Sequence, residues 1–190
     1  MLKDLVCKMI PGPFFILPQT VILRTRILSM KKFLILSLTL GLLSVSAMAQ
    51  MPSVTIEDHK GDAFNTSALL EEKTPMIISF WSTICKPCIR ELDAINDVLP
   101  DWLDEADFRV VAVSTDDSRF TTKARSLAEG HGWYDFINLY DTNQEFMRAM
   151  SVSVTPQVFV LDGEGKIVYS HTGYVPGNEE ELIEVIKGLE

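Results

Sequence analysis

The sequence predicts an α/β fold in which helices flank a central mixed β-sheet. Two nearly continuous apolar runs, at 76–81 and 108–114, are typical of strands that are buried on both faces of a sheet. An amphipathic helical pattern lies between them, and a hairpin signal followed by a helical segment closes the chain. Because 47% of the 190 residues are hydrophobic, the chain can bury an ordinary core, and its length suits one domain with an extension.

The first elements of the predicted domain are a short strand pair over 53–64, which turns at Lys60-Gly61, and the buried strand over 76–81. Apolar residues then recur at steps of three and four and predict an amphipathic helix over 87–103. They are Ile89, Leu92, Ile95, Leu99 and Leu103. Pro100 has no N–H to donate, so we expect it to kink this helix or to end it early.

The second half of the domain is predicted to alternate strands and helices before it ends in a hairpin and a helix. The expected elements are a strand at 108–114, a helix at 117–129, a strand at 137–140, a helix at 143–150, strands at 157–161 and 166–170, and a helix at 179–189. Asp162-Gly163 between two apolar strands is a typical antiparallel hairpin signal.

The start of the chain has the layout of an export signal. Met30 is followed by the positive pair Lys31-Lys32, an uncharged apolar run covers 33–45, and Ala47-Met48-Ala49 offers small residues to a signal peptidase. The apolar run is shorter than the roughly 20 residues of a membrane-spanning helix. An uncleaved N-terminal anchor is the alternative to a cleaved signal peptide.

We therefore divide the chain into three parts. Residues 1–29 are expected to be a non-native extension upstream of the true start, 30–49 a signal peptide cut between Ala49 and Gln50, and 50–190 the folded domain. The predicted location is the periplasm or another exported compartment. Residues 50–190 hold 25 acidic and 11 basic residues, a net charge of −14, so nucleic acid is not an expected partner. A monomer is the default expectation.

The most informative motif is Cys85-Lys86-Pro87-Cys88, which follows the strand at 76–81 and opens the next helix. The loop that these two cysteines would close is too short to restrain the unfolded chain much. The pair is therefore better explained as redox-active than as structural. Cys85 at the helix N-terminus is predicted to be the attacking thiol, because the helix dipole and Lys86 stabilise its thiolate. Cys88 lies on the same helix face and is predicted to resolve the mixed disulfide.

Metal binding is the main alternative use of such a pair. A zinc site needs a second Cys/His pair, which the chain lacks. His59, His131 and His171 are scattered singly, and each is expected to be an ordinary surface or turn residue. We therefore expect no metal and no cofactor other than the Cys85–Cys88 disulfide.

Several segments of the chain resemble a known superfamily. The run from Phe80 to Cys88 resembles the active-site segment of thioredoxins, and Thr155-Pro156 resembles the loop with a cis-proline that faces it. The stretch 115–142 resembles the insertion of TlpA/ResA-type redoxins, which are related to the AhpC/TSA proteins. The resemblance covers roughly 53–190 and implies a thioredoxin-like fold with an N-terminal strand pair and a helix–strand insertion before the Thr-Pro loop.

The resemblance also implies roles for individual residues. Thr155, Pro156 and Trp81 are expected to bind or border the substrate. Glu91 occupies the place of an acidic residue that tunes the thiols or shuttles a proton, with a solvated helix charge as the alternative. Two departures are Ser79, where thioredoxins keep a buried aspartate, and Ile84, where a tryptophan is usual.

The function implied by the resemblance is thiol–disulfide exchange, most simply the reduction of disulfides in exported proteins, with electrons from a membrane thiol carrier. Apocytochrome c cysteines are the first substrate it suggests, and a reduction potential nearer thioredoxin than DsbA is expected. Two alternatives stay open: a Sco-like copper chaperone with His171 as third ligand, and a thiol peroxidase.

Overall fold

The computed structural model describes residues 50–189. The expected upstream extension and signal peptide, at 1–29 and 30–49, lie outside the described residues. Within residues 50–189, no helix is both long enough and apolar enough to cross a membrane.

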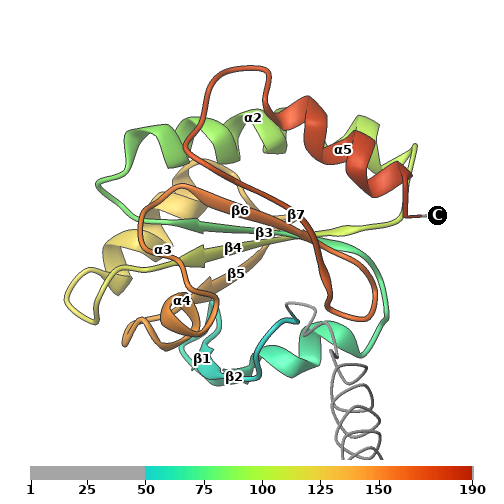
Figure 1. The fold of residues 1–190 in the computed structure, drawn as a ribbon. Helices are drawn as coiled ribbons and strands as arrows, with labels where there is room; N and C mark the ends of the chain where they lie inside the picture. The colour runs from blue at the N-terminus through green and yellow to red at the C-terminus, as the bar shows by residue number, and fades with distance from the viewer. Residues whose placement is uncertain (1–49, 190) are drawn as a thin grey trace, which may run out of the picture. The chain divides into compact units, whose positions relative to one another are not determined.

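The described residues form a seven-stranded mixed sheet with helices on both faces (Figure 1). In chain order the elements are β1 (Thr55–Glu57), β2 (Ala63–Asn65), the 3-10 helix η1 (Thr66–Leu70), β3 (Met76–Trp81), α2 (Lys86–Leu103), β4 (Arg109–Ser114), α3 (Thr121–Gly130), β5 (Ile137–Tyr140), α4 (Glu145–Ala149), β6 (Gln157–Leu161), β7 (Ile167–Thr172) and α5 (Glu179–Lys187). The strand order is β2-β1-β5-β4-β3-β6-β7. The predicted α/β fold with a mixed sheet is confirmed.

Strand β3 lies inside this sheet, between β4 and β6, and leads directly into the cysteine motif. It pairs in parallel with β4 and antiparallel with β6, so that Ser79 lies opposite Ala112 on one side and Val158 on the other. All six of its residues are buried, as its continuous apolar pattern predicts. The hairpin expected after β6 is also present, because β7 pairs antiparallel with β6 and Val158 lies opposite His171.

The two faces of the sheet carry separate cores. Buried residues of α2, α3 and α5 pack on one face against Ile77, Trp81 and Val158. Residues of η1 and α4 pack on the other face against Met76, Ile78 and Phe80. Figure 1 shows α2 and α5 together over the first face. The side chains that share this face with α2 are therefore those that can reach the cysteine motif.

Helix α2 spans Lys86–Leu103, within one residue of the predicted 87–103, so Pro100 does not end it early. The proline is exposed in the last turn, whereas Trp102 beyond it is buried, so burial of the indole offsets the lost backbone hydrogen bond. Helix α3 begins at Thr121 rather than at 117, because the preceding residues form a turn in which Phe120 N–H donates to Asp117 O.

Candidate active site

The cysteine motif lies where β3 ends and α2 begins. Cys85 is the residue that caps the helix: its N–H donates to Ser82 O at 3.0 Å, and its Sγ accepts the N–H of Cys88 at 3.3 Å. Pro87 stands in the first turn, where a missing N–H leaves no hydrogen bond unmade. The helix N-terminus thus directs the backbone N–H of Cys88 at Cys85 Sγ, which is the arrangement that stabilises a thiolate.

The two sulfur atoms are joined in a disulfide, with 5.3 Å between the Cα atoms of Cys85 and Cys88. The cysteines differ in their surroundings: Cys85 is half-buried, whereas Cys88 has no exposed surface. A substrate can therefore approach Cys85 but not Cys88. Ile84, immediately before Cys85, is 83% exposed and presents an aliphatic side chain at the rim.

The loop before Cys85 is held by Asp116, a residue that sequence reasoning missed. Its carboxylate accepts the N–H of Thr83 at 2.8 Å and the hydroxyl of Thr83 at 3.1 Å. It also accepts the hydroxyl of Ser114 at 3.0 Å. Asp116 follows the C-terminal end of β4, which runs parallel to β3, so both strands deliver their last residues to the same edge. That topology was the signal that could have identified it.

The Thr155-Pro156 loop lies beside the motif. Its peptide bond is cis, as the resemblance implies. Strand β6 starts directly after it, and Gln157 pairs with Phe80 near the end of β3. Pro156 is buried and Thr155 is half-buried, so part of Thr155 is open to a ligand.

Trp81 lies beneath the motif rather than at its surface. Its side chain is 1% exposed, and its ring packs edge-on against Trp133 with 5.1 Å between centroids. Its backbone carbonyl accepts the N–H of Thr115 at 2.8 Å. In this structure Trp81 supports the cysteine loop from below, and no part of its ring is open to a substrate.

Glu91 is not a solvated helix charge. It has no exposed surface, and its Oε1 lies 2.6 Å from Nε2 of His171 on β7. Burial raises the pKa of Glu91 above its usual value, while the hydrogen bond and charge of His171 act in the opposite direction. The expectation that His171 is an ordinary surface residue is wrong, since only 12% of its side chain is exposed.

Ser79, which stands where thioredoxins keep an aspartate, is also buried. Its hydroxyl has no hydrogen-bond partner among residues 50–189. Ser79 lies opposite Val158, and Val158 lies opposite His171, so the three residues form a row across β3, β6 and β7. Among the residues of this row, His171 is the titratable one.

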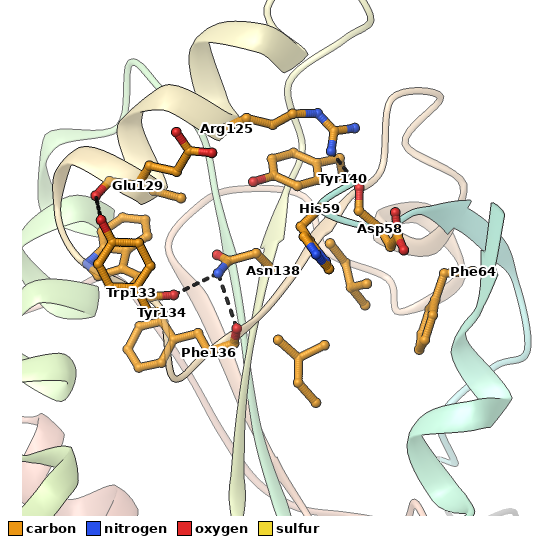
Figure 2. A pocket seen from close by; sticks show the side chains of 13 residues that line it. Asp58, His59, Phe64, Arg125, Glu129, Trp133, Tyr134, Phe136, Asn138 and Tyr140 are labelled. Atoms are coloured by element: carbon orange, nitrogen blue, oxygen red, sulfur yellow. Dashed lines mark hydrogen bonds between the residues drawn. The ribbon is translucent and has the colours of Figure 1, made fainter. Parts of the chain in front are cut away.

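A cavity of about 600 Å³ lies elsewhere, between α3, β5 and the β1–β2 turn (Figure 2). Figure 2 shows Asn138 near its centre, with Phe64 and Tyr134 on opposite sides. The Asn138 amide donates to the carbonyl oxygens of Trp133 and Phe136 at 2.8 and 3.2 Å. No cysteine lines this cavity, so size alone does not locate the redox chemistry.

In the described part of the chain, no three His, Cys, Asp or Glu side chains lie together in a way that could hold a metal ion. His171, the third ligand considered for copper, has its Nε2 against Glu91.

Comparison with known proteins places this geometry in context. The family model described as Redoxin matches residues 47–186. The solution structure of a thioredoxin-like protein from Porphyromonas gingivalis is 48% identical, with a TM-score of 0.66, over 75% of this chain and 92% of that one.

Curated relatives of this chain carry functional names. The thiol-disulfide oxidoreductase ResA of Bacillus subtilis is 26% identical over 130 residues, which are 68% of this chain and 69% of the relative. The thiol:disulfide interchange protein DsbE of Yersinia pestis is 28% identical over 125 residues, which are 65% of this chain and 62% of that relative.

Proposed function

This chain belongs to the redoxin family and is a thioredoxin-like thiol–disulfide oxidoreductase, and from that premise we propose that it reduces disulfides in exported proteins. The observation that carries the proposal is the asymmetry of the Cys85–Cys88 pair at the start of α2. One sulfur is reachable and lies at a helix N-terminus, and the other is buried one turn along. Exchange through a mixed disulfide requires one cysteine that attacks the substrate and a second that resolves the mixed disulfide.

In this proposal the Cys85 thiolate attacks a substrate disulfide and forms a mixed disulfide, and one substrate sulfur leaves as a thiolate. Cys88 then attacks Cys85, which releases the second substrate thiol and leaves the Cys85–Cys88 disulfide. Two electrons have passed to the substrate. The protein is returned to its dithiol form by a donor, for which a membrane thiol carrier is the proposed class.

The substrate is held by the loops around Cys85. Thr155 is half-buried beside the motif, and its backbone is suited to pair with an extended segment that carries the target cysteine. The exposed Ile84 gives this surface an aliphatic rim. Pro156 and Trp81 shape the site from within. Apocytochrome c cysteines, presented in an extended segment after export, are the proposed physiological target.

A redox titration of the purified protein against thiol buffers, in a Cys7→Ser background, tests the proposal. We expect a reversible two-electron couple nearer the thioredoxin value of about −270 mV than the DsbA value of about −120 mV. A couple near the DsbA value would indicate an oxidant or isomerase instead. The absence of any couple would remove the proposed function.

A further inference from the structure

The pair formed by Glu91 and His171 joins the cysteine helix to the far strand of the sheet. Fully buried carboxylates are rare and are normally paired, because removing the charge from water is costly. Here Glu91 is fully buried, and its one hydrogen-bond partner among residues 50–189 is the imidazole of His171 at 2.6 Å. The residues are 80 positions apart in the sequence, so only the fold brings them together.

Half of this pair's hydrogen-bonding capacity is unused. Glu91 Oε2 and His171 Nδ1 are both buried, and neither has a partner among residues 50–189. Buried unpaired polar groups each cost about 1–3 kcal/mol, so these two atoms lower the stabilisation that the pair can provide. An under-satisfied, titratable pair beside a reactive centre points to a role in moving a proton.

The position of the pair relative to the thiols supports that role. Glu91 is three residues after Cys88 on α2, so the two side chains share one helix face, and both have no exposed surface. His171 lies on the same side of the sheet, opposite Val158, and its backbone carbonyl accepts the Gln157 side-chain amide at 2.8 Å. This bond ties the backbone of His171 to β6, the strand that follows the Thr-Pro loop.

Other charged groups near the pair are mostly acidic. Glu179 on α5 raises the pKa of Glu91 further. Glu179 accepts a hydrogen bond from Tyr174, and Glu181 accepts one from Tyr169. Burial together with these partners raises the pKa of both tyrosines to about 12. Arg90, on the neighbouring position of α2, is exposed.

His171 is therefore the group that can offset a negative charge on Glu91. We propose that His171 is a positioning residue for the exchange reaction: it holds Glu91 beneath Cys88 and shares with it the proton that Cys88 releases. This inference rests on the proposed function. When the mixed disulfide is resolved, the Cys88 thiol transfers its proton to the Glu91–His171 pair. The Cys88 sulfur then bonds to Cys85 Sγ, and the substrate sulfur leaves with the electron pair of the broken S–S bond. When a donor dithiol later reduces the disulfide, the pair returns the proton to Cys88.

The test separates the two thiol steps. Reduced protein in a Cys7→Ser background is mixed with one equivalent of the disulfide reagent dithiobis(nitrobenzoate). The first thionitrobenzoate is released by attack of Cys85, and the second is released when Cys88 resolves the mixed disulfide. General acid–base assistance typically contributes about 10²–10⁴-fold. We expect His171→Ala to slow the second phase at pH 7 by about 10- to 100-fold and the first phase by less than about 2-fold.

The pH profile and a conservative variant distinguish proton sharing from a loss of structure. In His171→Ala the rate of the second phase should rise steeply between pH 6 and 9, whereas in the wild type this rate should depend less on pH. His171→Gln can still donate a hydrogen bond to Glu91 but cannot take the proton, so it should retain the steep profile even if His171→Ala does not fold. A wild-type rate and profile in His171→Gln would overturn proton sharing.

The chain offers a matched control in His131, whose Nδ1 lies 2.8 Å from Asp93 on the same helix α2 but in a partly exposed pair. His131→Ala should leave both phases unchanged, and an equal slowing there would also overturn the proposal. If the wild type releases no second thionitrobenzoate, the proposed function itself fails, which is a different outcome.

Discussion

Removal of the Asp116 carboxylate is the sharpest test of how the cysteine loop is held. Asp116→Ala takes away the acceptor for the Thr83 N–H, the Thr83 hydroxyl and the Ser114 hydroxyl, at 2.8, 3.1 and 3.0 Å. Thr83 and Ser114 are both buried, so their donors have little access to replacement water. The loop from Ser82 to Ile84 would then keep mainly its backbone contacts.

The expected loss follows from these three bonds. A hydrogen bond to a charged group contributes about 1.5–3 kcal/mol when one partner is deleted. Asp116 is only half-buried, so water can replace part of this, and we expect the free energy of unfolding to fall by about 2–4 kcal/mol in total. Asp116→Asn keeps one acceptor oxygen and should lose about half as much.

Guanidinium unfolding of the oxidised protein, followed by tryptophan fluorescence, measures this loss. The neighbouring Asp117 provides the control, since its side chain is paired with Arg119 at the surface. Asp117→Ala should leave the unfolding midpoint near the wild-type value. Equal stability of Asp116→Ala and the wild type would refute the reasoning, because it would mean that the loop does not depend on this carboxylate.

Three further predictions concern other parts of the molecule. Because burial raises the folded-state pKa of Glu91, the folded protein binds more protons than the unfolded chain above pH ~4.3, and wild-type stability should fall as pH rises from there through the raised value. Glu91→Gln should remove that pH dependence. Between pH 4 and pH 8, measured by chemical unfolding, its free energy of unfolding should rise relative to that of the wild type by about 1.4 kcal/mol for each unit by which the pKa of Glu91 is raised. A difference between variant and wild type that does not change with pH would contradict this. Gly163→Ala places a Cβ 2.0 Å from the carbonyl oxygen of Lys73 and should lower the unfolding free energy by about 1–3 kcal/mol, whereas Gly130→Ala, with nothing within 4 Å, should not destabilise the protein. Reduced Cys88→Ser should accumulate a mixed disulfide with a peptide whose two cysteines are joined in a disulfide, visible by mass spectrometry, and reduced Cys85→Ser should accumulate none. Trapping by Cys85→Ser alone would reverse their proposed roles.

Most of the fold could be predicted from local patterns. The strands β3, β5 and β6 lie at the predicted residues, and β4 begins one residue after its predicted start. Continuous apolar runs and turn residues carry this information without reference to the rest of the chain. The expectation that Pro100 would end α2 early failed because tertiary packing outweighed the local effect of proline: Trp102, beyond it, is buried.

The sequence by itself also determined the chemistry of the motif. The spacing of Cys85 and Cys88 and their place between an apolar strand and a helix predict a disulfide at a helix N-terminus, and these features are local.

Only the tertiary structure decided which side chains support the motif. Asp116 meets Thr83 because β3 and β4 run in parallel and end at one edge, and His171 meets Glu91 because the β6–β7 register places it on the face that α2 covers. A one-residue change of that register would turn His171 to the opposite face. Such pairs depend on strand order and register between distant segments, which the periodicity of a single segment does not encode.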